Sequence, residues 1–379
     1  MMRIFKKKIK VRGFDEARSL QKIDRKSYII HHYCPHTFNA GDHFVIRSIR
    51  QHLTRFLPGA TFIPKPCAFN RGWGKPVRLT GENVNFSNRY ADAVIVGGSD
   101  QYNNWSLRIL PDEISKLQPP LYFIGLGVSS KNIDAPPHIE KKEYYEHIRL
   151  ANEATRLSSV RDNYTRDFLI KLGYEKAVVT GCPAMYLFDA PFALNESDDV
   201  AITFPFPVVR RNNRAEFDRL LETVRLIVRL VRARGLNPII SCHDDRDVPL
   251  AQNYFPEERI FFSNYVDDFF SFYQQVKLVI GSRLHASILA AGMGKPFINI
   301  NLDARGKGFS DTFGLSDWNL DINDPRLERH LQDRMERLLG GDLSPLQAFY
   351  ETKNGYRRIF LKFMQDVSQD IAGRLPGKG

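Results

Sequence analysis

Residues 277–296, KLVIGSRLHASILAAGMGKP, decide the fold because they change from one type of secondary structure to another within a short span. The apolar run 278–280 is typical of a buried strand. Apolar side chains then recur at helical spacing over 284–291, and Ser282 stands where a helix N-cap is expected. After a turn that contains glycine, a second apolar run follows at 297–300. This strand, helix and strand together predict a parallel β-sheet covered by helices.

The same alternation extends over most of the chain and falls into two halves. A stretch at 188–199 that is rich in proline, asparagine and acidic residues separates them and is typical of a linker. Strands are expected at 27–33, 93–96, 121–124, 157–160 and 177–179 in the first half, and at 200–204, 238–241, 259–262, 278–280 and 297–300 in the second. We therefore predict a basic N-terminal segment (1–26), two α/β domains (27–190 and 191–342), and a C-terminal helix and tail (343–379) that pack on the domains.

Length and composition agree with two folded domains. The chain has 379 residues, of which 43% are hydrophobic and 12% aromatic. This is more than one core usually organises, and it excludes a disordered chain. The formal net charge of +11 predicts an anionic partner without identifying it. Because the basic residues are scattered and no nucleic-acid-binding motif accompanies them, we expect no nucleic-acid partner.

The N-terminal stretch MMRIFKKKIKVR carries several basic residues and no acidic one. No apolar core of a signal peptide follows it, and no apolar run in the chain is long enough to span a bilayer. We therefore expect a cytoplasmic protein whose basic segment is either a solvated tail or a contact with the cytoplasmic face of the inner membrane. The wide spacing of the cysteines argues against a zinc site and a disulfide framework (Cys34, Cys67, Cys182 and Cys242).

Ligands in open α/β sheets bind where strands end and helices begin, because backbone NH groups and the helix dipole point outward there. Asn39, Gly41 and Asp42 follow the first predicted strand, where Gly41 allows a tight turn and Asp42 is placed to cap the next helix. Two further junctions consist of glycines, which either admit a ligand or only serve the turn, and they do not complete a dinucleotide-binding fingerprint. These glycines are Gly97, Gly98, Gly125 and Gly127.

Arg283 and His285 form the most specific pattern. They lie in the first turn of the helix that Ser282 is expected to cap, where both side chains can flank an anion at the helix N-terminus. Arg161 occupies an equivalent junction in the first half, before a helix predicted at 163–172. If the two halves face one another, Arg161, Arg283 and His285 converge on one anionic ligand. Taken separately, each residue is better explained by a structural role: an ion pair for Arg161 and a core hydrogen bond for His285.

The loop SCHDDRD at 241–247 follows a strand of the second half. It brings His243, Asp244 and Asp245 to the strand end, where one of them could act as a base on an acceptor hydroxyl. A polar loop with helix caps is the plainer interpretation. The run HHYCPH at 31–36 suggests metal ligands, but Pro35 interrupts it, and we predict no metal site.

Taken together, the order of these elements resembles the polysaccharide pyruvyl transferase family, from about Ile29 to Leu315. Its sharpest part is Ser282-Arg283-Leu284-His285. The remaining parts are the junctions at 39–42, 97–98, 125–127 and 159–162, followed by Gly181-x-Pro183-Ala184 and Gly294-Lys295-Pro296. The chain departs from the family pattern at Ser99, where a third glycine is usual, and at Cys182, where Asp is common.

The resemblance implies two Rossmann-like domains that face each other across a cleft, similar to the GT-B glycosyltransferases, with the donor site in the second domain. It implies transfer of a pyruvyl group from phosphoenolpyruvate, without a cofactor, to a sugar of a cell-surface polysaccharide or of its lipid-linked precursor, forming a pyruvate ketal. Arg161, Arg283 and His285 match the family's Arg and His positions and are the expected catalytic residues, with His285 as proton donor. The expected substrate-binding residues are Asn39, Gly41, Asp42, Gly97, Gly98, Gly125, Gly127, Ser282, Leu284, His243 and Asp244. The alternative is a GT-B glycosyltransferase that uses a nucleotide sugar.

Overall fold

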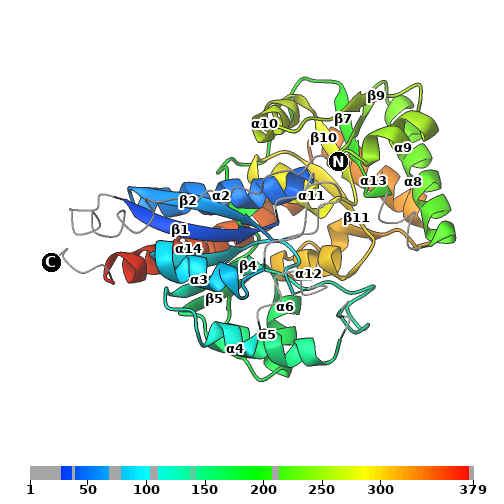
Figure 1. Cartoon of the computed structure of the whole chain (residues 1–379). Helices are drawn as coiled ribbons and strands as arrows, with labels where there is room; N and C mark the ends of the chain where they lie inside the picture. Colours follow the sequence, from blue (N-terminus) through cyan, green and yellow to red (C-terminus); the bar gives the residue numbers. More distant parts are fainter. Residues whose placement is uncertain are drawn as a thin grey trace, which may run out of the picture.

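The framework of the protein is two six-stranded parallel sheets covered by helices (Figure 1), as a computed structural model shows for residues 27–35, 39–67, 78–102, 110–137, 139, 141–206 and 213–374. One sheet comes from each half of the chain, so the predicted α/β class with two Rossmann-like halves is confirmed. We call the first sheet with its helices the first lobe, and the second sheet with its helices the second lobe. The basic segment 1–26 lies outside the described residues.

The first sheet has the strand order β2-β1-β3-β4-β5-β6. Strands β3 and β4 at its centre are buried along their whole length, as the continuous apolar runs predict for a sheet covered on both faces. The strands are β1 (Tyr28–Cys34), β2 (Ala60–Pro66), β3 (Ala93–Gly97), β4 (Leu121–Leu126), β5 (Leu157–Val160) and β6 (Val178–Val179). The helices are α2 (Ala40–Phe56), α3 (Glu82–Tyr90), α4 (Pro111–Ile114), α5 (Glu143–Glu153) and α6 (Asn163–Lys171), and the 3₁₀ helix η3 (Pro183–Tyr186) follows β6.

The second sheet has the order β12-β11-β10-β7-β8-β9. Its strands are β7 (Asp199–Thr203), β8 (Asn237–Ser241), β9 (Arg259–Phe261), β10 (Leu278–Gly281), β11 (Phe297–Asn301) and β12 (Asn319–Asp321). Its helices are α8 (Arg214–Arg232), α9 (Asp247–Tyr254), α10 (Val266–Gln275), α11 (Leu284–Gly292), α12 (Ala304–Phe313), η4 (Ser316–Trp318) and α13 (Leu327–Leu339). The apolar stripe of α8 is buried as its spacing predicts.

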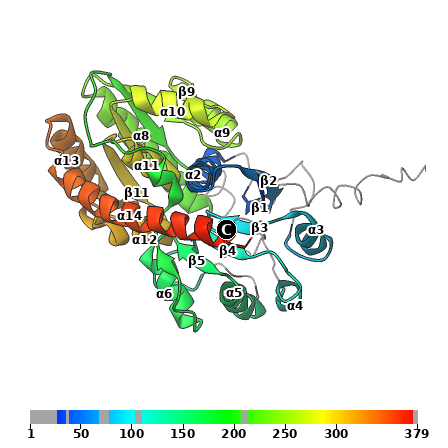
Figure 2. The same ribbon diagram turned by 90° about the vertical axis from the view of Figure 1, so that its left-hand side faces the viewer.

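The C-terminal helix α14 (Ser344–Ala372) links the lobes. It leaves the second lobe after α13 and returns along the first, as the red helix in Figure 2 shows. Phe360 and Met364 are buried on it, and Asp370 near its end accepts a hydrogen bond of 2.6 Å from the Tyr122 hydroxyl of β4. The expected packing of this helix on both halves is therefore confirmed. None of the helices in the described ranges is long and apolar enough to cross a membrane.

Two predicted helix caps are wrong. Helix α2 begins at Ala40 and is capped by Asn39, whose side chain accepts a 3.0 Å hydrogen bond from the Gly41 N–H, so Asp42 lies inside the first turn. Helix α11 has Arg283, not Ser282, in its cap position. The Ser282 N–H still donates to Thr203 of the neighbouring strand, so the chain leaves the sheet one residue later than expected.

Candidate active site

The two lobes meet where their parallel strands end and the following helices begin. The Ala40 N–H at the start of α2 donates to the His243 carbonyl of the second lobe at 2.7 Å. At a second place the Ala304 N–H of α12 donates to the Ser130 carbonyl of the first lobe at 3.2 Å. Ligands of open α/β sheets bind at such ends, so this junction is the candidate active site.

His285 of α11 lies directly against the first turn of α2. A Cβ added to Gly41 would come within 2.6 Å of the His285 Cβ and closer still to Nδ1. The close contact between His285 and α2 therefore requires a residue without a side chain at position 41, whereas the backbone angles there are ordinary. Nε2 of His285 is buried and has no hydrogen-bond partner among the described residues.

Arg161 comes to the same place from the first lobe, at the end of β5. Its guanidinium pairs with Asp100 at 2.6 Å and with Asp162 at 3.1 Å, and it donates to the Val128 carbonyl at 3.2 Å. Gly127 makes room for it, since a Cβ there would lie 2.8 Å from the terminal nitrogen NH2 of Arg161 and closer to Cζ. Asp162 also caps α6 by accepting the Thr165 N–H.

Arg305 is a site residue that sequence analysis missed. It lies in the first turn of α12 and pairs with Asp303 at 2.6 Å and, across the lobes, with Asp100 at 3.1 Å. The missed signal is the sequence Asp303-Ala-Arg305 after β11, because a helix-capping aspartate with an arginine within two residues also occurs after β5, where Arg161 precedes the cap Asp162.

Arg283 approaches from the second lobe and is held by Asp247 of α9. One terminal nitrogen donates to both carboxylate oxygens of Asp247, at 2.7 Å and 2.5 Å. Asp247 also accepts hydrogen bonds from the N–H groups of His243 and Asp244. The loop after β8 thus orients the Asp247 carboxylate, which in turn holds Arg283. Nε of Arg283 is buried without a partner among the described residues.

These charges govern the protonation of His285. Burial, which disfavours the charged imidazolium, and the neighbouring cations of Arg161, Arg305 and Arg283 together lower the pKa of His285 to about 3. Asp100 acts in the opposite direction. For Asp100, burial opposes ionisation, but Arg161 and Arg305 outweigh it and lower the pKa. The imidazole is therefore neutral at pH 7 and surrounded by arginines that are paired with aspartates.

The three expected catalytic residues thus lie together, whereas several expected substrate-binding residues serve packing. A Cβ at Gly97 would meet Ile49 at 2.5 Å, and Gly98, with φ +72°, is packed against Val45, so both let α2 lie close to the sheet. Gly125, with φ +61°, abuts Pro183. Ser282 and Leu284 are half-buried beside the cap of α11.

Two of the three candidate bases in the loop after β8 are also bound by neighbouring side chains. His243 is fully buried, and its Nε2 lies 2.8 Å from the Tyr273 hydroxyl. Asp244 is held by Arg246 through contacts of 2.6 Å and 2.5 Å. Burial and the adjacent Asp244 raise the pKa of Asp245, whose Oδ1 is buried without a hydrogen-bond partner within the described ranges. Asp245 is accordingly the residue of this loop best able to accept a proton.

No group of three or more His, Cys, Asp or Glu in the described part of the chain is arranged to hold a metal ion. His36 of the HHYCPH run lies outside the described residues. His31 is bonded through Nδ1 to Ser87, and Cys34 is buried with a free thiol.

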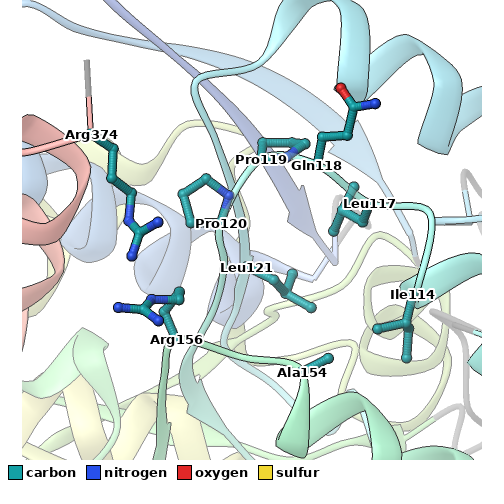
Figure 3. A pocket seen from close by; sticks show the side chains of 9 residues that line it. All are labelled: Ile114, Leu117, Gln118, Pro119, Pro120, Leu121, Ala154, Arg156 and Arg374. Carbon is teal, nitrogen blue, oxygen red and sulfur yellow. The ribbon is translucent and has the colours of Figure 1, made fainter. Parts of the chain in front are cut away.

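A separate pocket of about 200 Å³ lies at the opposite end of the first sheet, where β4 and β5 begin (Figure 3). Pro119, Pro120 and Leu121 line it, and Figure 3 shows the guanidinium groups of Arg156 and Arg374 on one side. Both arginines pair with Asp370 of α14. Its place at the amino ends of the strands separates it from the candidate active site.

Comparison with known proteins gives one family. The family model for polysaccharide pyruvyl transferase matches residues 39–303, which is more than half of the chain and includes Arg161, Arg283 and His285. No curated protein matches the sequence.

Solved structures share the fold at low sequence identity. UDP-GlcNAc 2-epimerase from Methanocaldococcus jannaschii, in complex with UDP-GlcNAc and UDP, has a TM-score of 0.54 at 15% identity, over 88% of this chain and 98% of that one. The Neisseria meningitidis UDP-GlcNAc 2-epimerase bound to UDP-GlcNAc has a TM-score of 0.54 at 10% identity, over 89% of this chain and 100% of that one. UGT73P12 of Glycyrrhiza uralensis, complexed with glycyrrhetinic acid 3-O-monoglucuronide, has a TM-score of 0.50 at 8% identity, over 91% of this chain and 90% of that one. These likenesses establish a GT-B-like fold alone.

Proposed function

Because the chain belongs to the polysaccharide pyruvyl transferase family, we propose that it transfers a pyruvyl group from phosphoenolpyruvate to a sugar of a cell-surface polysaccharide, or of its lipid-linked precursor, and forms a pyruvate ketal. The observation that supports this best is the neutral imidazole of His285 beside Arg161, Arg283 and Arg305. Phosphoenolpyruvate carries a phosphate and a carboxylate on one enol carbon, so its site needs two sets of cationic donors and an acid between them.

The arginines are suited to both anionic groups of the donor. A guanidinium offers paired N–H groups that match phosphate and carboxylate oxygens. Arg161 and Arg305 approach from opposite lobes and share Asp100, while Arg283 also acts on His285 and has a buried Nε without a partner among the described residues. A donor between the lobes would therefore contact cations from both, which couples donor binding to the arrangement of the lobes.

His285 has the task of protonating the donor. In the empty site it is neutral, and the negative charges of a bound donor raise its proton affinity. The imidazolium then gives its proton to the methylene carbon, which becomes a methyl group, and the adjacent carbon becomes an oxocarbenium-like electrophile. An acceptor hydroxyl adds to that carbon, and the proton of this hydroxyl restores the imidazolium.

The second step closes the ketal. A second hydroxyl of the same sugar attacks the same carbon, the bond to the phosphate oxygen breaks, and the second hydroxyl proton leaves with inorganic phosphate. Asp245, with its raised pKa and unpartnered oxygen, is the group of the β8–α9 loop suited to take this proton from the second hydroxyl and pass it to the departing phosphate. His243 and Asp244, which their neighbours already bind, have no assigned step.

A lipid-linked acceptor would place the enzyme at the membrane surface. A basic segment such as 1–26 is attracted to anionic lipid headgroups, and each basic residue near such a surface contributes about 1 kcal/mol. On the cytoplasmic face of the inner membrane, that attraction would hold the enzyme next to a lipid-linked acceptor.

The test is to incubate the purified protein with phosphoenolpyruvate and a panel of cell-surface oligosaccharides, and to measure product mass and inorganic phosphate. We expect a pyruvyl mass gain matched by phosphate release. A nucleotide-sugar glycosyltransferase is the competing assignment, and thermal shift separates the two because only a bound ligand stabilises the fold. Stabilisation by UDP, GDP or CMP sugars, without any by phosphoenolpyruvate, would contradict the proposal.

A further inference from the structure

Asp100 joins arginines from the two lobes. One carboxylate oxygen lies 2.6 Å from the NH2 nitrogen of Arg161 in the first lobe, and the other lies 3.1 Å from the NH1 nitrogen of Arg305 in the second. The Arg161 side chain is 4% exposed and that of Asp100 is 21% exposed. The carboxylate thus stands between two cations and beside the imidazole of His285, whose pKa it raises.

The backbone is strained in the conformation that places Asp100 there. Ser99 has φ +62°, and it is the only non-glycine residue with positive φ in the described ranges. The Gly127 N–H donates to the Ser99 carbonyl at 2.9 Å, which ties this turn to the loop that makes room for Arg161. Strain of this kind persists when the surroundings hold it in place, and it gathers at functional sites.

We propose that Asp100 is a specificity-determining and positioning residue of the donor site, whose carboxylate is a resident counter-ion that bridges Arg161 and Arg305 until an anionic donor displaces it. This rests on the proposed function. Each arginine keeps a second aspartate, Asp162 for Arg161 and Asp303 for Arg305. Both side chains therefore stay in place when Asp100 releases them while remaining beside His285, and their freed N–H groups become available to the donor.

The counter-ion has two consequences. The Asp100 carboxylate cancels part of the positive charge of the two arginines. A ligand with a single carboxylate therefore gains little binding free energy by displacing it. A multiply charged donor interacts with the arginines more strongly than Asp100 does and displaces it. Once the donor has engaged the arginines, the Asp100 charge remains beside His285 and favours the imidazolium that protonates the methylene carbon. Asp100 therefore opposes binding and supports turnover.

Asp100→Asn separates this role from a merely structural one. The amide keeps the shape and one acceptor but loses the charge. We expect binding of phosphoenolpyruvate and of inorganic phosphate, measured by titration calorimetry at low salt, to become tighter by about tenfold. We expect kcat to fall, and the gain in affinity to shrink as ionic strength rises. Asp100→Glu, which keeps the charge, should return both affinities toward those of the unchanged protein.

The matched control is Asp311→Asn, which removes one negative charge from an exposed i,i+4 pair with Lys307 on α12. It should change neither affinity. If Asp100→Asn binds both anions no more tightly than the unchanged protein, or more weakly with a lower melting temperature, Asp100 is only a clamp between the lobes and the inference is overturned. Failure of the unchanged protein to bind or use phosphoenolpyruvate would contradict the proposed function instead, and inorganic phosphate would still test the counter-ion.

Discussion

The imidazole of His285, on the first turn of α11, rests against the α-carbon of Gly41 on the first turn of α2, although the two residues belong to different lobes. Two helix N-termini therefore converge on one point, where the positive ends of the two helix dipoles favour an anion. The same convergence disfavours a positive charge on His285, which agrees with the pKa of about 3 in the absence of a ligand.

Gly41→Ala should slow transfer strongly. The added methyl group would lie within 2.6 Å of the His285 Cβ, so the imidazole or the whole lobe must shift. A displacement of this size at the reacting group costs about 100-fold in rate. Steady-state kinetics would measure it, with Gly355→Ala on α14 as the control, since a Cβ there meets nothing within 4 Å. Full activity of Gly41→Ala would show that the contact does not position His285.

His285→Ala should remove turnover and leave donor affinity largely intact. The imidazole supplies a proton, whereas the arginines supply the contacts to the anions. Calorimetric titration with phosphoenolpyruvate and a phosphate-release assay would report the two quantities separately. His330→Ala, at a half-exposed histidine of α13 paired with Asp324, is the control. A His285→Ala enzyme that still turns over would remove His285 from the mechanism.

Donor binding at pH 7 should be accompanied by uptake of a proton. His285 is neutral in the empty site because its pKa is about 3, and a multiply charged anion raises that value. Calorimetry in buffers of different ionisation enthalpy would detect the proton, and NMR of the ring would assign it. Release of a proton, or a ring that stays neutral in the complex, would contradict the prediction.

The shift of His285 also makes the fold less stable in acid. Its pKa is lower in the folded than in the unfolded chain, so between about pH 6.5 and pH 3 the unfolded state binds the proton and the folded state does not. The free energy of unfolding should therefore fall over this range, and His285→Gln should reduce the fall. Denaturant unfolding at a series of pH values would measure the slope, and an identical slope in the variant would exclude the contribution.

Ser99→Gly should stabilise the protein by up to about 1 kcal/mol without loss of activity. A left-handed backbone conformation costs an L-residue about 1–2 kcal/mol, and glycine avoids this strain. The gain is smaller than the strain because glycine loses more conformational entropy on folding. Ser99 has φ +62°. Denaturant titration would give the difference in the free energy of unfolding. A lower stability for the glycine variant would mean that the serine side chain makes a compensating contact.

Asp370→Asn should loosen the end of α14. Partial burial opposes ionisation of this carboxyl group, but hydrogen bonds from Arg374, Tyr122 and Arg156 outweigh it and lower the pKa to about 2. Because the folded value lies below the unfolded one, its stabilisation is present above about pH 4 and lost as pH falls toward 2. We expect a loss of about 1–3 kcal/mol at pH 7, measured by thermal or denaturant unfolding. An unchanged stability would show that this cluster does not hold the helix.

Sequence pattern located the strands with a buried, continuous apolar run, and failed where the run was interrupted. The edge strand β2 was missed because Pro64 and Pro66 interrupt its pattern, and an edge position tolerates them since their missing N–H groups are not needed for pairing. The short β12 gave no pattern long enough to recognise. Arg305 escaped notice because its partner Asp100 is far away in the sequence.

The sequence by itself determined the α/β class, the two halves, and the places of Arg161, Arg283 and His285 at ends of strands, because periodicity and local junctions are properties of neighbouring residues. Only the tertiary structure decided that Gly41 touches His285, that every arginine of the site has an aspartate partner, and that Asp100 spans the lobes. These contacts join residues distant in the chain, and their charges act through space, so no local pattern could carry them.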